Sequence, residues 1–109
     1  SCKLPKTLVK KNDIHITSKR NFDCFQDTEL DMLLKRTLHV KNIIICGVNT
    51  DTCVYGTTFG ASNRGYNPIV IECCTGSMRG EDQHKTALKI MSQSIAWVMK
   101  KEEILNKLN

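Results

Sequence analysis

The chain has 109 residues, of which 40% are hydrophobic and 25% are charged, and its formal net charge is +5. This size allows one ordinary globular domain, and no run approaches the roughly 20 apolar residues that span a membrane. Because the basic residues are not interleaved with aromatic ones, we interpret them as solvated surface and expect neither a nucleic-acid partner nor a membrane partner.

The six cysteines favour reduced thiols over a disulfide framework. Cys46 and Cys73 lie in or beside apolar runs, and the loops lack the glycine and proline density of disulfide-rich scaffolds. No segment resembles a signal peptide, so we expect a cytoplasmic protein. The sequence contains no CxxC motif and no cysteine–histidine set with zinc spacing, so it predicts neither a metal site nor a cofactor.

The amino-terminal third is predicted to contain one strand and one helix. Residues 7–10 leave two alternatives open, a short edge strand or an irregular lead-in. Residues 13–17 (DIHIT) alternate between polar and apolar side chains, which predicts a strand with one better-buried face. A loop over residues 18–25 follows. Leucines at helical spacing then predict an amphipathic helix from Asp27 to Leu38.

Residues 42–66 contain the strongest candidate for a reactive side chain. The apolar run over residues 43–46 is typical of a strand that is covered on both faces of a parallel sheet. Capping residues follow it, so we expect a helix that begins at Thr52 or Cys53 and ends at Gly65. A thiol at a helix N-terminus faces unpaired amides and the positive end of the helix dipole, which favour the thiolate. Cys53 is therefore the first candidate nucleophile.

The last third is predicted to contain a strand and two helices. Residues 67–72 form an apolar strand that starts with proline, and residues 73–82 form a loop. Asp82 caps a helix that extends to Met99, and residues 102–108 form a last short helix. Strands and helices that alternate imply right-handed crossovers and a parallel sheet.

We therefore predict an α/β fold with three layers, α/β/α, around a Rossmann-like parallel sheet. Three strands are few for a sheet that is covered on both faces. We accordingly expect that one or more amino-terminal strands lie outside this chain, and that residues 1–109 form the carboxy-terminal part of a single larger domain.

Three of the predicted loops meet at the carboxyl end of this sheet, where the chemistry of open α/β proteins is found. Two of them carry Lys19 and Cys53, which we expect to be neighbours. The lysine would hold a thiolate by charge and stabilise negative charge that develops on a substrate. The third loop carries Cys74, Ser77 and Arg79, which we expect to contact the substrate. The strand pattern places no histidine at this end, so the sequence shows no obvious general base.

The residues around Cys53 resemble a known family. Cys53-Val54, Thr57, Ala61 and Gly65-Tyr66 match the CV…T…A…GY pattern of the isochorismatase-like cysteine hydrolases. Lys19 with Phe25, Thr28 and Leu30 matches the family's lysine and its F…T…L segment, and His84 with Ala87-Leu88 matches a later helix. The resemblance runs from about Asp13 to Met99. Among subgroups it is closest to amidases that act on carbamoyl or biuret-type substrates, including N-carbamoylsarcosine.

This resemblance implies a role for each matching residue. Cys53 would be the nucleophile and Lys19 the catalytic lysine. The amides of Asn49 and Cys53 would form the oxyanion hole, after a cis peptide between Val48 and Asn49. Phe25 would line the substrate pocket. The implied activity is hydrolysis of a C–N bond in a small amide or carbamoyl compound.

One catalytic residue of the family has no counterpart in this sequence. It is an aspartate at the end of the family's first strand. Asp13 lies at the wrong end of its predicted strand, Asp51 is interpreted as part of the turn, and Asp23 matches no motif. We therefore expect a second chain or a missing amino-terminal segment to carry the aspartate, and we expect a homo-oligomer.

Two other functions remain open. The chain could be a catalytically incomplete family member or a split-domain fragment that acts as a binding or scaffold protein. It could also be a redox-sensing thiol protein, in which Cys53 would form a reversible disulfide with Cys24 or Cys74.

Overall fold

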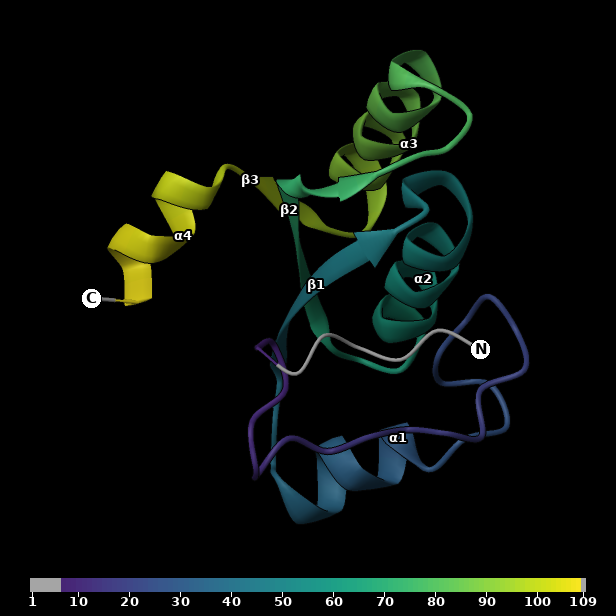
Figure 1. The fold of residues 1–109 in the computed structure, drawn as a ribbon, viewed down its shortest axis with the longest axis vertical. Helices are drawn as coiled ribbons and strands as arrows, with labels where there is room; N and C mark the ends of the chain where they lie inside the picture. The colour runs from purple at the N-terminus through teal and green to yellow at the C-terminus, as the bar shows by residue number, and fades with distance from the viewer. Residues whose placement is uncertain (1–6, 109) are drawn as a thin grey trace.

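The computed structural model of the protein describes residues 7–108 and contains a three-stranded parallel sheet (Figure 1). The strands β1 (Asn42–Val48), β2 (Asn67–Gly76) and β3 (Trp97–Met99) lie in the order β1-β2-β3. Both neighbouring pairs are parallel, which confirms the predicted sheet type. Within the described residues, no helix is long and apolar enough to cross a membrane.

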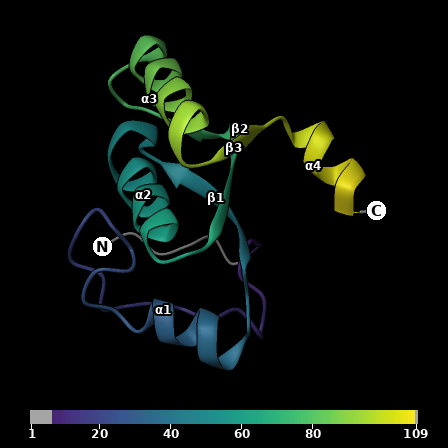
Figure 2. The same cartoon turned by 180° about the vertical axis from the view of Figure 1, so that it is seen from behind.

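Helices lie on both sides of this sheet, as Figures 1 and 2 show from opposite directions. The helices α2 (Tyr55–Asn63) and α3 (Glu81–Ser94) lie on one side, and α4 (Lys101–Leu108) lies on the other. The core between the sheet and the helices α2 and α3 consists of Ile45, Val54, Val70, Ala87, Leu88 and Met91. A smaller cluster, Ile71, Met99 and Ile104, packs α4 against the opposite side. The predicted three-layer arrangement is therefore present.

The pairing of β1 with β2 is interrupted by a bulge of several residues. Ile45 pairs with Val70 and Gly47 pairs with Thr75, so β2 uses five residues where β1 uses two. This irregularity lets β2 run to Gly76, whereas the sequence predicted a loop from Cys73. Bulges of this kind re-aim side chains and occur often next to functional sites.

Two predicted elements are wrong. Residues 13–17 are irregular, and Ile14 is 56% exposed, because no strand of the described structure pairs with this segment. The helix predicted to reach Met99 ends at Ser94, and residues 97–99 pair with residues 69–71 as β3. The apolar residues after Ser94 fit the periodicity of a helix as well as that of a strand. They form a strand because β2 has an open edge with which they can pair.

Two further predictions hold only in part. The helix expected from Asp27 is shorter, since α1 spans Leu30–Met32 and continues as the π-helical turn η1, Leu33–Thr37. Asp27 has a φ of 56°, which is not helical. The strand β1 is not buried on both faces, because Ile45 is buried whereas Ile44 and Cys46 are exposed. The last helix is confirmed as α4.

A separate cluster joins the α1 segment to the end of α2. Phe25, Ala61 and Tyr66 are buried together, and the rings of Phe25 and Tyr66 stack with centroids 5.4 Å apart. The Tyr66 hydroxyl donates a 2.7 Å hydrogen bond to Oδ1 of Asp31. Burial and this carboxylate raise the pKa of Tyr66 from 10.0 to about 12, and the same bond lowers the pKa of Asp31. Gly65, with a φ of 90°, ends the helix before Tyr66 as predicted.

This pair predicts how stability depends on alkaline pH. The folded chain retains the Tyr66 proton to a higher pH than the unfolded chain, so the unfolded state loses its proton first. The free energy of unfolding should therefore fall as the pH rises from 10.0 through about 12, by more than in Tyr66→Phe. Urea denaturation at several pH values measures it. Tyr55→Phe is the matched control, because it removes a phenol but leaves the Asp31 bond intact. Identical pH slopes for wild type and Tyr66→Phe would contradict this assignment.

Candidate active site

The turn after β1 places Cys53 at the start of a helical segment. The peptide bond between Val48 and Asn49 is cis, which is the position implied by the family resemblance. A π-helical turn, η2 (Thr50–Val54), follows and leads directly into α2. Helical structure thus begins at Thr50, slightly before the predicted Thr52 or Cys53. The Asn49 carbonyl accepts hydrogen bonds from the amides of Thr52 (3.1 Å) and Val54 (3.0 Å), and Cys53 is half-buried.

Lys19 and Cys53 line the same cavity, which has a volume of about 190 Å³. Its other lining residues are Cys24, Ile45, Cys46, Val48, Val54 and Thr57. A second hollow of about 340 Å³ also has Lys19 and Cys53 in its wall, together with Arg20, Asn21 and Phe22. The two residues nominated from the sequence therefore face common space, although they are 34 positions apart in the chain (53 − 19).

The loop that carries Lys19 is fixed to α2 by hydrogen bonds. The Thr57 hydroxyl donates to the carbonyl of Phe22 (3.2 Å) and accepts from the amide of Cys24 (3.0 Å). Thr57 lies one helical turn after Cys53, so a single side chain of the helical segment that follows Cys53 bonds this loop on both sides of Asp23. The threonine of the CV…T pattern thus has a structural role that its spacing alone did not reveal.

Close approach of the same loop requires small residues on α2. A Cβ atom at Gly56 would lie 3.3 Å from Cβ of Phe22, and one at Gly60 would lie 2.5 Å from both carboxylate oxygens of Asp23. Asp23 is held there by Arg64 at 3.3 Å, and it accepts a 2.8 Å hydrogen bond from the amide of Phe25. Glycine at these positions therefore lets the loop lie directly on the helix.

The Cys53 turn is tied to the elements around it by three side chains. Oδ1 of Asn49 accepts a 3.0 Å hydrogen bond from the amide of Met78. The buried hydroxyl of Thr50 lies 2.7 Å from Nδ1 of His84, which is also buried. These contacts fix the turn to the β2–α3 loop and to the first turn of α3. His84, matched to a family helix from the sequence, is thus a packing partner of the turn.

Asp51 makes the third tie. Its carboxylate accepts a 2.7 Å hydrogen bond from the Ser77 hydroxyl and pairs with Arg79 at 3.2 Å. The Ser77 bond, with help from the Arg79 charge, holds the pKa of Asp51 below its ordinary value. Ser77 and Arg79 were expected to contact a substrate, and the structure instead places both on Asp51. Their partner was not predictable, because it lies 26 and 28 positions away.

Phe25 and Cys74 lie away from the walls of the two cavities at Cys53. Phe25 is 3% exposed and belongs to the core cluster with Tyr66. The aromatic ring that lines a cavity with Cys53 is that of Phe22, in the same loop. Both phenylalanines were visible in the sequence, but only the path of the irregular backbone decides that Phe25 is buried in the core while the exposed Phe22 lies beside Cys53. Cys74 lies exposed on β2, next to Cys46.

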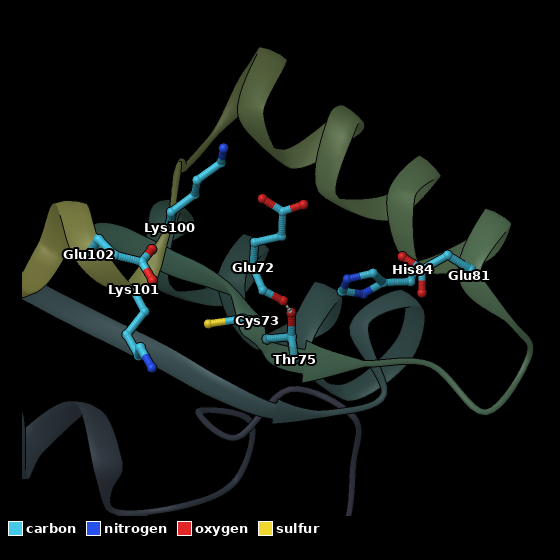
Figure 3. Close-up of a pocket in the computed structure, with 8 residues that line it drawn as sticks. All are labelled: Glu72, Cys73, Thr75, Glu81, His84, Lys100, Lys101 and Glu102. Carbon is cyan, nitrogen blue, oxygen red and sulfur yellow. Dashed lines mark hydrogen bonds between the residues drawn. The ribbon is translucent and has the colours of Figure 1, made fainter.

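A larger cavity of about 550 Å³ lies between the end of β2, α3 and α4 (Figure 3). It is lined by Glu72, Cys73, Thr75, Glu81, His84, Lys100, Lys101 and Glu102. Figure 3 shows the Cys73 thiol on the side of Lys101 and Glu102, away from the His84 ring. Because that ring is already bonded to Thr50, this cavity does not contain a cysteine–histidine pair, and its size alone indicates no chemistry.

Carboxylates and metal ligands are sparse near Cys53. Among the described residues, no aspartate or glutamate lines either cavity that Cys53 shares with Lys19. Asp23 is bonded to Arg64, Asp51 to Ser77, and Asp13 accepts a hydrogen bond from the amide of Lys10. Residues 7–108 also contain no group of three or more His, Cys, Asp or Glu side chains that could hold a metal ion.

The contact between Asp23 and Gly60 can be tested by mutation. Gly60→Ala should lower the free energy of unfolding by about 1–3 kcal/mol, as overpacking of a closely fitted site does. Gly76→Ala is the control, because a Cβ there meets no atom within 4 Å. Urea denaturation measures both variants. Equal stability of the two would show that the loop does not lie against α2 as described.

The sequence matches the Isochorismatase domain family over residues 3–103. An uncharacterized isochorismatase family protein of Escherichia coli O157:H7, YecD, is 33% identical over 97 residues, which make up 89% of this chain and 50% of YecD. A second relative, YwoC of Bacillus subtilis, is 28% identical over 96% of this chain and 54% of its own length. The chain thus spans about half the length of these relatives.

Solved structures agree with the sequence match. An isochorismatase-like hydrolase from Alkaliphilus metalliredigens is similar with a TM-score of 0.90 and 25% identity, over 100% of this chain and 58% of that protein. The nicotinamidase SaPncA from Staphylococcus aureus has a TM-score of 0.70 and 35% identity, over 74% of this chain and 51% of its own. The chain therefore belongs to the isochorismatase-like cysteine hydrolase family and has that family's α/β fold.

Proposed function

We propose that this protein contributes the nucleophile to hydrolysis of a C–N bond in a small amide or carbamoyl compound. The observation that carries this proposal is the cavity that Cys53 and Lys19 share at the start of the helical segment. Amide hydrolysis is also the activity named for the similar Staphylococcus aureus nicotinamidase. A family of hydrolases, a thiol at a helix start and an adjacent cation together favour this reaction class.

In the proposed cycle, Cys53 attacks the substrate carbonyl and forms a tetrahedral intermediate. The amides of Asn49 and Cys53 hold its oxyanion, and Lys19 adds positive charge nearby. Collapse of the intermediate breaks the C–N bond, and ammonia or an amine leaves with a proton. Water then cleaves the thioester, which releases the acid and restores the thiol.

A proton carrier completes this cycle, and we propose that it is an aspartate from outside this chain. Asp13, Asp23 and Asp51 all have other partners. The strand β1 is at one end of the described sheet, and its side chains Ile44 and Val48 are 45% and 67% exposed. These features leave room beside Cys53 for a further polypeptide segment or a second chain. Assembly with such a partner, or as a homo-oligomer, remains a prediction.

The missing carboxylate also favours a second candidate function. Without a proton carrier, the chain would bind small amides or a partner protein and would not turn them over. Cytoplasmic activity of either kind remains a prediction from the sequence.

The reactivity of Cys53 is the first test. We expect iodoacetamide near neutral pH to modify Cys53 several-fold faster than Cys46, Cys73 or Cys74, although those three are exposed and Cys53 is half-buried. Peptide mass spectrometry at short reaction times measures the order. If exposure alone sets the rates, Cys53 will react more slowly than these three cysteines, and that result would contradict its assignment as the nucleophile.

Lys19 should act on this reaction through its charge. Lys19→Met should slow alkylation of Cys53 by about tenfold, as removal of a nearby opposite charge does. Lys89→Met, at an exposed position on α3, removes an equal charge elsewhere and is the matched control. Equal rates of Cys53 alkylation in both variants would show that the charge of Lys19 does not act on Cys53.

Turnover separates the two candidate functions. Release of ammonia from N-carbamoyl, biuret-type and nicotinamide-type amides, measured for wild type and Cys53→Ala, should be abolished in the variant if the hydrolase proposal holds. If the wild-type chain releases no ammonia even when it is produced together with the segment or chain that supplies the aspartate, while Cys53 alkylates rapidly, the binding role is favoured.

A further inference from the structure

The bulge in the sheet brings two exposed cysteines of neighbouring strands together. Gly47 of β1 pairs with Thr75 of β2, and the residues just before them are Cys46 and Cys74. Both thiols are free and exposed. Neighbouring strands lie about 4.8 Å apart, and disulfides join residues whose Cα atoms are about 4.4–6.8 Å apart. Because Cys46 and Cys74 each stand one residue before the paired Gly47 and Thr75, they occupy neighbouring places on the two strands, which a bridge between them requires.

The electrostatics of Cys46 agree with this placement. Its pKa is raised by burial first, then by the charge of Cys74 and a hydrogen bond to the Cys74 thiol, and last by the charge of Cys73. Of the neighbouring thiols, that of Cys74 raises the pKa of Cys46 the most. Cys73, the preceding residue, lines the 550 Å³ cavity, where its thiol lies on the side of Lys101 and Glu102 (Figure 3). The two adjacent cysteines of β2 therefore serve different surroundings.

We propose that Cys46 and Cys74 are a reversible disulfide pair that exchanges with low-molecular-weight disulfides such as oxidised glutathione. The Cys74 thiolate attacks the external disulfide, which forms a mixed disulfide and releases one small thiol. Cys46 then gives up its proton, attacks the Cys74 sulfur and displaces the second small thiol. One external S–S bond is broken and one protein S–S bond is formed, with two electrons and two protons passed to the external disulfide.

This pair differs from the disulfides considered from the sequence, which joined Cys53 to Cys24 or Cys74. Cys46 also lines the cavity of Cys53, so a mixed disulfide on either residue could be attacked by the thiolate of the other. A bridge from Cys46 to Cys74 removes Cys46 as a partner of Cys53 in such a reaction. The proposal does not rest on the hydrolase chemistry, because it concerns which thiols join.

Peptide mapping tests the pairing directly. The reduced chain is incubated with oxidised glutathione, blocked with N-ethylmaleimide and digested without reduction. Trypsin leaves residues 42–64 and 65–79 as single peptides, and a second cleavage before Asp51 separates Cys46 from Cys53. The expected product is a link between the peptide of Cys46 and residues 65–79 that dithiothreitol removes.

The adjacent cysteine supplies the matched control. Cys73→Ser should keep the link, whereas Cys46→Ser and Cys74→Ser should each lose it. Retention of the link in Cys74→Ser would assign it to Cys73 and overturn the proposal. A link from Cys53 to Cys24 or to residues 65–79, or mixed disulfides with no internal link, would overturn it as well. None of these results depends on turnover, so failure here and failure of the hydrolase proposal are distinguishable.

Discussion

The candidate site depends on one contact, in which an irregular loop lies directly on the helix that carries Cys53. Thr57 bonds both sides of that loop, and Gly60 leaves the space that the Asp23 carboxylate occupies. The loop has no strand or helix of its own around Lys19, so its position comes from these side-chain contacts. These contacts, together with the hydrogen bond from Ser18 to Glu29, hold the segment that carries Lys19 beside Cys53.

The Cys53 turn is rigid for a different reason. Asn49, Thr50 and Asp51 are consecutive, and each bonds a different part of the β2–α3 connection or α3. Three neighbouring residues with separate partners fix the path of the backbone, which a catalytic thiol and its oxyanion amides require. Polar residues that look from the sequence like generic helix caps are therefore used mainly for tertiary bonds.

The thiols divide into groups with different environments. Cys53 and Cys24 share a small cavity with a lysine, whereas Cys74 is exposed on the bulged sheet. Cys46 belongs to both groups, since it lines that cavity and its pKa is raised in part by the neighbouring Cys74. The bulge produces this overlap, because a regular register would place residue 71, rather than Cys74, opposite Cys46. A local irregularity of the sheet thus links the surroundings of Cys53 to an exposed thiol pair.

The sequence by itself determined the parts of this protein that short-range patterns encode. The apolar runs of β1 and β2, the glycine that ends α2, the last helix and the cysteine at a helix start all follow from local periodicity and capping. These features depend on residues a few positions apart, so the chain order is enough to reveal them. The expectation that Lys19 lies near Cys53 came instead from the predicted sheet order, and the family pattern agreed with it.

Only the tertiary structure decided the features that depend on distant partners. Residues 97–99 form a strand because they pair with β2, whereas residues 13–17 pair with no strand of the described sheet, although β1 is at its end. Phe22 rather than Phe25 lines a cavity with Cys53. Ser77 and Arg79, which were expected to contact a substrate, bond Asp51. The physical reason is common to all four. Hydrogen bonds and packing across tens of residues select among conformations that local sequence leaves nearly equal.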